Sequence, residues 1–391
     1  MVKLGTICRF QSGGTPAKGI IEYYNGTIPW VTTVALNGGK INEEDAVEWI
    51  TEKAIRESAA KVVPANSVLV GTRVGVGKVA VNAVAMSTSQ DVIALLDIDE
   101  SRWNKDYICK FLQGKSSFLN AQARGATIKG IKIDVLSSLE LPEISLSEQD
   151  RISQTIDSVK RIIEYRQQEL SALDDLIKAR FVEMFGDPTD NPLGWDKAGI
   201  ATVTRGKASN GYFAKRDEYV KDGNVAVLGV AYVVNRMYSQ VNGLPRTNAT
   251  QADIQKYSVK YGDMLFCRSS LVAEGIGKAS IVPEKTPENT LFECHVIRLP
   301  LDLNLVVPEF MQALSTTDYF RNQIISQSKT ATMTTIGQDG ILKTEIIFPP
   351  IEKQHEFYLF VKQIEKTKAA VQKALDEAQL LFDSLMQEFF G

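Results

Sequence analysis

Apolar residues recur at alternating spacings of four and three along two stretches of the chain. The first stretch covers residues 146–190, where Arg166 and Arg180 interrupt the series, and the second covers residues 351–391, where Lys368 interrupts it. This spacing predicts two amphipathic helices with a continuous apolar seam. The seam residues are Ile152, Ile156, Val159, Ile163, Leu170, Leu173, Ile177 and Met184 in the first stretch, and Phe357, Val361, Ile364, Val371, Leu375, Phe382, Leu385 and Phe389 in the second.

Each predicted helix has about 39 residues and would be roughly 58 Å long at about 1.5 Å per residue. A helix of this length with an exposed apolar stripe would not be stable alone in water. Ser147–Asp150 suits the start of the first helix, and Gly186 followed by Pro188 suits its end. We expect the two helices to pair as an antiparallel coiled coil. The alternative is that each seam packs only on its own globular unit.

The two long segments outside the helices show a different pattern, with short β-branched runs separated by Gly, Asn, Pro and Ser. Such runs are typical of short strands joined by turns. Helical additions are expected at residues 107–123 and 308–327. The expected strands include residues 67–70, 78–81, 92–96, 264–266 and 279–282.

The chain also repeats itself once, with a period near 205 residues. The match is clearest at Gln149 and Gln354 and continues to Gly186 and Gly391. Weaker matches pair Arg73 with Arg268, Gly77-Lys78 with Gly277-Lys278, and Thr127-Ile128 with Thr335-Ile336. Since an internal repeat fixes the order of units, we expect an α+β protein with two mostly-β units, each followed by a long helix. The expected domains are residues 1–145, 146–190, 191–350 and 351–391.

The net charge of the 391 residues is −3, from 44 basic and 47 acidic side chains. This average argues against a nucleic-acid partner, but the acidic excess lies in the two helical stretches, and the two long segments are near neutral. The four cysteines are scattered and form no Cys-x-x-Cys pair, so neither a zinc site nor a disulfide framework is expected. Neither a signal peptide nor a membrane span is indicated, which predicts a cytoplasmic protein without membrane contact.

The chain shows little sign of catalytic chemistry. Gly71–Lys78 looks like a phosphate-binding loop but has Thr72 where that motif needs glycine and Val79 where it needs a hydroxyl. A turn between two neighbouring strands is the better interpretation. Phe348–Ile351 is the nearest string to the motif of amino-methyltransferases, and it lacks the polar and aromatic residues of that motif. We therefore expect no catalytic residues and no metal site in this chain.

Two windows without acidic residues are candidates for a nucleic-acid surface. Residues 107–133 contain five Lys or Arg side chains, and residues 319–338 contain Arg321 and Lys329 among Gln, Ser and Thr residues. Basic side chains suit phosphates, and neutral polar side chains suit base edges. A solvated basic face explains either window alone, but its recurrence in both halves favours nucleic-acid binding.

Three strings resemble the specificity subunits of type I restriction-modification systems: Ser12–Pro16, Tyr24–Val31 and Gly125–Ile131. The resemblance covers the whole chain and implies two target-recognition domains, each followed by a conserved helix. It implies that each recognition domain reads one half of a bipartite DNA sequence and that the antiparallel helices set the unread spacer. One departure is that residues Thr204–Asn210 lie near the place where the second unit should repeat Ser12–Pro16.

The resemblance also implies partners and contact residues. Double-stranded DNA, two modification subunits that methylate adenine, and restriction or motor subunits are the expected partners. S-adenosylmethionine, ATP and Mg²⁺ would be bound by those subunits, so this chain should need no cofactor. A coiled-coil interaction scaffold that reads no DNA remains the alternative. The expected DNA contacts are Ser12, Gly13, Gly14, Thr15, Arg73, Lys78, Arg124, Thr127 and Lys129 in the first unit, and Lys207, Arg268, Lys278, Lys329, Thr335 and Gln338 in the second.

Overall fold

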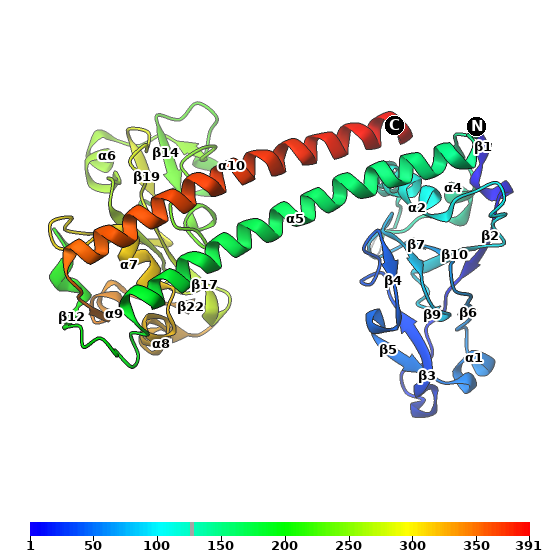
Figure 1. Cartoon of the computed structure of the whole chain (residues 1–391), viewed down its shortest axis with the longest axis horizontal. Helices are drawn as coiled ribbons and strands as arrows, with labels where there is room; N and C mark the ends of the chain where they lie inside the picture. The colour runs from blue at the N-terminus through cyan, green and yellow to red at the C-terminus, as the bar shows by residue number, and fades with distance from the viewer. Residues whose placement is uncertain (126–128) are drawn as a thin grey trace. The chain divides into compact units, whose positions relative to one another are not determined.

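The computed structural model describes residues 1–125 and 129–391, and the chain divides into two compact units. Unit 1 comprises Met1–Gln167 with Lys373–Gly391, and unit 2 comprises Gln168–Gln372. Two helices of 40 residues each, α5 (Leu146–Phe185) and α10 (Ile351–Phe390), contribute to both units (Figure 1). The α+β architecture with two long helices agrees with the sequence-based prediction.

Two sheets form the globular part of unit 1. One has five strands in the order β2-β10-β7-β8-β4, and the other has four in the order β5-β3-β9-β6. A two-stranded pair, β1 and β11, brings the two ends of the globular part together. The strand bounds are β1 Val2–Lys3, β2 Arg9–Ser12, β3 Tyr24–Val31, β4 Lys40–Ile41, β5 Glu48–Ile50, β6 Val62–Val63, β7 Val68–Gly71, β8 Val79–Asn82, β9 Met86–Thr88, β10 Val92–Leu96 and β11 Glu140–Leu141.

Helices α2 and α3 pack on the five-stranded sheet of unit 1, and α1 packs on the four-stranded sheet. The side chains of α2 enclose a core with β7, β8 and β10, and Tyr107, Phe111 and Leu112 are completely or almost completely buried in it. Thr51 caps α1 by accepting a hydrogen bond from the Ala54 N–H, and Asn104 caps α2 in the same way from the Tyr107 N–H. The helix bounds are α1 Glu52–Glu57, α2 Lys105–Gly114, α3 Ser116–Gln122 and α4 Ile133–Ser137.

Unit 2 has a similar plan but divides its strands among more sheets. Its central sheet has the order β13-β20-β16-β18, and smaller sheets have the orders β15-β14-β19, β17-β22-β21 and β12-β23. The strand bounds are β12 Lys197–Gly199, β13 Ser209–Asn210, β14 Val225–Leu228, β15 Arg246–Thr247, β16 Asp263–Cys267, β17 Ser269–Ser270, β18 Ala279–Ile281, β19 Thr290–Phe292, β20 Val296–Pro300, β21 Lys329–Thr330, β22 Thr334–Thr335 and β23 Glu345–Ile347.

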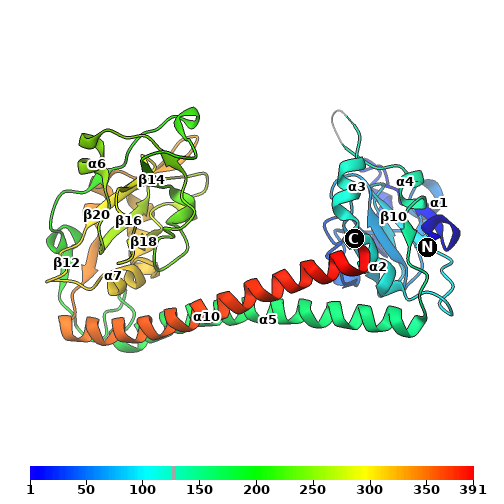
Figure 2. The ribbon, with the colours of Figure 1, turned by 90° about the horizontal axis from the view of Figure 1, so that it is seen from above.

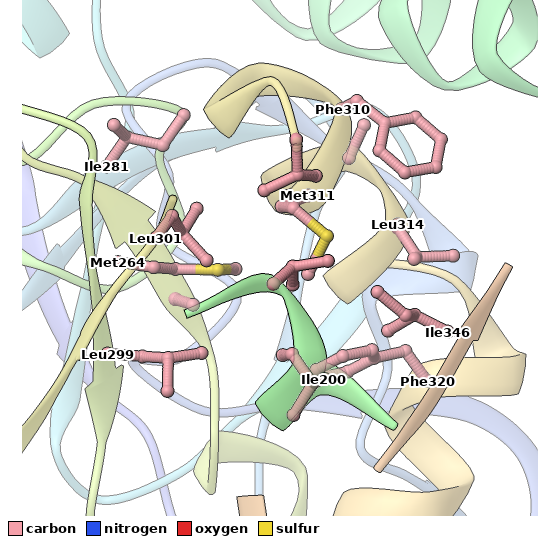
Figure 3. Close-up of a cluster of buried hydrophobic side chains, with 14 of the residues drawn as sticks. Ile200, Met264, Ile281, Leu299, Leu301, Phe310, Met311, Leu314, Phe320 and Ile346 are labelled. Atoms are coloured by element: carbon pink, nitrogen blue, oxygen red, sulfur yellow. The ribbon is translucent and has the colours of Figure 1, made fainter. Parts of the chain in front are cut away.

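The core of unit 2 lies between its central sheet and the helix α7. Met264 and Leu299 from the sheet meet Phe310, Met311 and Leu314 from the helix, and all five side chains are fully buried (Figure 3). The helix bounds are α6 Gln251–Tyr257, α7 Pro308–Ser315, α8 Asp318–Gln327 and α9 Gln338–Leu342. The helical additions expected at residues 107–123 and 308–327 are thus confirmed as α2 with α3 and α7 with α8.

The long helices run antiparallel within each unit (Figure 2). In unit 1, Val159 and Ile163 of α5 form a cluster with Ala378, Leu375 and Phe382 of α10. The ends of the same helices also pack on the globular core, where Phe390 lies 5.4 Å from the Tyr107 ring centre. Helix pairing and packing on the globular unit, stated as alternatives from the sequence, therefore both occur.

The predicted seam holds for the first turns of both helices and shifts near their C-terminal ends. Phe181 and Phe185 are buried beside Phe357, whereas Met184 is only partly buried. Phe390, at the position equivalent to Phe185, is likewise more buried than its neighbour Phe389. Near its end each helix packs on a globular core rather than along a coiled-coil seam, so the spacing of four replaces the alternation of four and three.

A buried glutamine fixes the start of each long helix. The side-chain oxygen of Gln149 accepts a hydrogen bond from the Asn104 N–H at 2.8 Å, and that of Gln354 accepts one from the Val307 N–H at 2.9 Å. Both side chains are fully buried. Because a buried amide without partners is costly, these bonds explain why the repeat is clearest at this pair.

Candidate nucleic-acid interface

A tight turn connects β7 and β8 in unit 1. The Gly71 N–H donates to the Lys78 carbonyl at 2.8 Å, and the Gly77 N–H donates to the Gly71 carbonyl at 3.0 Å. Gly77 has a φ of +79°, a conformation that favours glycine. The string that resembled a phosphate-binding loop is therefore a turn between antiparallel strands, as the sequence analysis preferred.

Unit 2 has the same turn between β16 and β18. The Cys267 N–H donates to the Lys278 carbonyl at 2.8 Å, and the Gly277 N–H donates to the Cys267 carbonyl, also at 2.8 Å. Gly277 has a φ of +62°. These bonds make Cys267 equivalent to Gly71 and Lys278 equivalent to Lys78, so the sequence match at Gly-Lys is confirmed.

Backbone bonds join this turn to two further segments in unit 1. The Thr72 N–H donates to the Asp91 carbonyl at 2.8 Å, and the Ile131 N–H donates to the Thr72 carbonyl at 2.8 Å. Arg124 and Gly130 form an antiparallel bridge beside them. We call this arrangement of three segments the loop frame.

The loop frame of unit 2 has the same bonds. The Arg268 N–H donates to the His295 carbonyl at 2.8 Å, and the Ile336 N–H donates to the Arg268 carbonyl at 3.0 Å. Lys329 and Thr335 pair across β21 and β22, where unit 1 has its Arg124–Gly130 bridge. Each frame is thus fixed by its backbone, independently of its side chains.

Two of the sequence matches are wrong in register. Arg268 corresponds to Thr72, so the counterpart of Arg73 is Ser269. Thr335 corresponds to Gly130, and Thr127 and Ile128 are therefore not its counterparts. The sequence match paired residues of the same type, whereas the backbone hydrogen bonds show which positions are structurally equivalent. Thr127 itself lies outside the described residues.

The side chains that face one another differ between the two frames. In unit 1 the Arg73 guanidinium lies 3.7 Å from the Asp91 carboxylate. In unit 2 the Ser269 hydroxyl and the His295 Nδ1 share a hydrogen bond of 2.8 Å. Asp91, Ser269 and His295 were missed by the sequence analysis because they share neither residue type nor a motif across the repeat.

Basic side chains lie at both frames. In unit 1, Arg73, Arg124 and Lys132 line a depression of about 690 Å³ together with Gln122 and Gly130. Two further lysines adjoin this region in the sequence, Lys78 and Lys129, and both side chains are exposed.

Unit 2 places a smaller number of cations at its frame. Lys329 is exposed, and Lys278 donates to the Asn235 side chain at 2.7 Å. The Arg268 guanidinium donates to the Cys294 carbonyl at 3.2 Å, so part of its hydrogen-bonding capacity is used within the unit.

Gly13 and Gly14 have a structural role in the described chain. A Cβ atom on Gly13 would collide with the Thr88 and Ser89 carbonyl oxygens, and one on Gly14 would collide with the Ala59 carbonyl. Gly13 thus allows the chain after β2 to lie against the turn that carries Asp91, and Gly14 allows it to lie against the segment of Ala59.

Unit 2 has its own counterpart of the Ser-Gly-Gly-Thr string. The Gly14 N–H donates to the Thr88 carbonyl at 2.9 Å, and the Tyr212 N–H donates to the Phe292 carbonyl at 2.7 Å. Gly211 is hemmed in by carbonyl oxygens as Gly13 is. The counterpart is therefore Asn210–Phe213, which begins where the Thr204–Asn210 stretch ends, so the sequence had placed that stretch near the right position.

The other predicted contacts are less closely grouped. Ser12 is exposed at the end of β2, Thr15 is partly buried, and Lys207 is exposed just before β13. Thr335 is exposed on β22. The Gln338 side-chain amide donates to the Ala208 carbonyl at 2.9 Å in the orientation that satisfies both of its ends. This bond connects α9 to the residue before β13.

Two cations of the predicted basic windows serve the fold instead. Lys110 is 6% exposed and forms an ion pair of 2.9 Å with Asp157 on α5. Arg321 is partly buried and donates to the Glu274 carbonyl at 3.1 Å. The number of basic residues in each sequence window is therefore larger than the number of cations available to a ligand.

Residues 1–174 match the family model of the type I restriction modification DNA specificity domain. The whole chain is 22% identical to the type I restriction enzyme MjaIX specificity subunit of Methanocaldococcus jannaschii, of which it covers 92%. The chain is thus similar to type I specificity subunits along its whole length, and residues 1–174 match their specificity domain. The relatives are named as specificity subunits, which agrees with the prediction of a non-catalytic recognition subunit.

Solved structures share the fold over the whole chain. The S subunit of the type I restriction-modification system from M. genitalium is 13% identical, with a TM-score of 0.54 and 95% of its chain covered. A chain from a study of complex assembly and conformational transition of the type I restriction-modification system is 16% identical, with a TM-score of 0.59 and 96% covered. None of the helices in residues 1–125 and 129–391 is long and apolar enough to cross a membrane.

Proposed function

We propose that this specificity subunit reads a bipartite DNA target in the cytoplasm, one half with the loop frame of each unit. The observation that carries the proposal is the recurrence of one backbone frame in both units, with basic residues at equivalent positions. These pairs are Lys78 with Lys278, and Arg124 with Lys329. A repeated frame with repeated cations suits a repeated ligand, and the two halves of a duplex target provide one.

The long helices have two roles in this proposal. Because α5 and α10 each continue from one unit into the other, their length would set the number of base pairs left unread. They would also dock two methyltransferase subunits, and restriction subunits would join the complex. Large apolar side chains exposed on these helices support docking there: Ile162, Tyr165, Leu380 and Leu381 in unit 1, and Leu176, Val182 and Leu359 in unit 2.

Near-neutral recognition units predict modest DNA affinity for the chain alone, because few counterions would be released on binding. Partner subunits would supply the remaining phosphate contacts, together with S-adenosylmethionine, ATP and Mg²⁺.

The proposal can be tested by purifying the chain together with the methyltransferase subunit of the same source. The complex is incubated with a pool of random duplexes, and bound DNA is sequenced at physiological salt. We expect enrichment of two short blocks at a fixed separation. Stable assembly without any enriched sequence would contradict DNA reading and support the interaction scaffold.

A further inference from the structure

We infer that the facing side-chain pair of each loop frame, Arg73 with Asp91 in unit 1 and Ser269 with His295 in unit 2, determines the base that the unit reads. The inference rests on the proposed function and adds which residues discriminate bases. It further assigns a guanine to the half-site of unit 1, opposite Arg73.

Four pairs of equivalent positions in the two frames carry the argument, and they fall into two classes. At Lys78 and Lys278, and at Arg124 and Lys329, both units carry a cation. The phosphate backbone is the same in every half-site, so a position that serves it can keep its charge in both units.

At the facing pair the chemistry changes while the backbone does not. The Thr72 and Arg268 amides, directly before Arg73 and Ser269, bind the carbonyls of Asp91 and His295 at the same 2.8 Å. An arginine and a carboxylate in one unit are thus replaced by a hydroxyl and an imidazole in the other. The two half-sites of a target differ in base sequence. Side chains that differ between the two units are therefore the ones suited to reading those bases.

The geometry in unit 1 suits guanine. The Arg73 side chain is 52% exposed, whereas that of Asp91 is 27% exposed. The carboxylate can therefore hold one side of the guanidinium while its other N–H groups remain available to a ligand. A guanidinium donates two parallel hydrogen bonds to O6 and N7 of guanine, the most frequent specific contact in the major groove.

The pair in unit 2 cannot form that fork. His295 Nδ1 is engaged with the Ser269 hydroxyl, so the imidazole offers Nε2 as a single hydrogen-bonding atom. A single hydrogen bond does not select guanine through two acceptors. Unit 2 should therefore have no guanine requirement at the equivalent base.

The test is the genome-wide methylation motif of strains whose chromosomal gene carries one variant. Arg73→Lys keeps the charge and removes the planar fork, so we expect one base of one half-site to be relaxed on the order of 10-fold while the other half-site is unchanged. The double variant Ser269→Arg with His295→Asp should add a guanine preference to the other half-site. Lys78→Ala is the matched control and should lower methylation evenly at all sites.

Either of two results would overturn the inference. One is an unchanged motif at full methylation in the Arg73→Lys strain. The other is an even decrease at all sites in an Arg73→Ala strain, which would assign Arg73 to a phosphate. Thermal melting of each purified variant shows whether it folds. If a single variant fails to fold, the double variant in unit 2 still tests the inference. If deleting the gene leaves the methylome unchanged, the proposed function itself fails. If deletion removes the motif and Arg73→Lys leaves it unchanged, only the inference fails.

Discussion

Gly13 and Gly211 occupy the same position in the two units, each with its Cα against two backbone carbonyls of the neighbouring turn. In unit 1 these carbonyls belong to Thr88 and Ser89, and in unit 2 to Phe292 and Glu293. The turn that follows carries the facing residue of the loop frame, Asp91 or His295. The glycine therefore fixes the distance between the strand and the frame.

Substituting this glycine should destabilise only the unit that contains it. We expect Gly13→Ala and Gly211→Ala each to lower the free energy of unfolding by about 1–3 kcal/mol, because backbone atoms must shift to admit a Cβ. Urea unfolding measures the effect. Gly19→Ala and Gly337→Ala are matched controls, since a Cβ there meets no atom within 4 Å. Equal stability of the Gly13 and Gly19 variants would contradict the argument.

A second prediction concerns the aromatic core at one end of the helix pair. Phe357 is fully buried, with its ring 5.8 Å from Phe181 and 5.7 Å from Phe185. Phe357→Ala should cost about 3–5 kcal/mol of unfolding free energy through lost burial and a cavity. Leu359→Ala on the same helix should change it by less than about 0.5 kcal/mol because Leu359 is 64% exposed. Calorimetry of the two variants distinguishes them, and similar losses would show that the helix faces are wrongly assigned.

The salt dependence of DNA binding separates phosphate contacts from structural cations. Arg124→Ala and Lys329→Ala should each reduce the slope of log affinity against log salt by about 1, uniformly across sequences. Lys110→Met removes the same charge from a buried lysine that is paired with Asp157, so it should leave the slope unchanged. Fluorescence anisotropy with the assembled complex gives all three slopes. A reduced slope for the Lys110 variant alone would reverse the assignment.

Unit 2 contains a buried carboxyl group that should make its stability depend on pH. Burial raises the pKa of Glu309 above its usual 4.5, although the Tyr238 hydroxyl donates to it at 2.7 Å. The folded state then binds a proton more tightly than the unfolded state, so the free energy of unfolding falls as pH rises above about 4.5 towards the raised pKa.

Glu309→Gln should weaken this pH dependence, because the amide cannot ionise and can still accept the hydrogen bond from Tyr238. Chemical unfolding is measured at several pH values from about 5 to about 8, the range in which most proteins are maximally stable. The slope of the unfolding free energy against pH is then compared between the variant and the parent. Identical slopes for the variant and the parent would show that another group is responsible.

Much of the fold could be predicted from the sequence because its signals are periodic or local. The helix seams, the glycine that ends α5 and the β-branched runs each reflect the geometry of one element. The shift of burial from Met184 to Phe185 could not be predicted, because it depends on which globular core the helix end meets. Lys110 appeared to be a surface cation for the same reason, since its partner Asp157 lies on another element.

The candidate interface was only partly predictable. Lys78 and Lys278 were matched correctly because a glycine with positive φ precedes both. Arg73 was matched to Arg268 by residue type, whereas its counterpart is Ser269. Asp91 and His295 share a backbone position and no chemistry, so only the hydrogen bonds of the folded chain reveal that they correspond.

The most direct test of the central claim is a genome-wide map of adenine methylation in the source organism, with and without this gene. We predict that deletion removes one bipartite motif, with two short blocks around a fixed unread spacer, and that re-expression restores it. An unchanged methylome in cells shown to express the chain and its methyltransferase subunit would contradict the account.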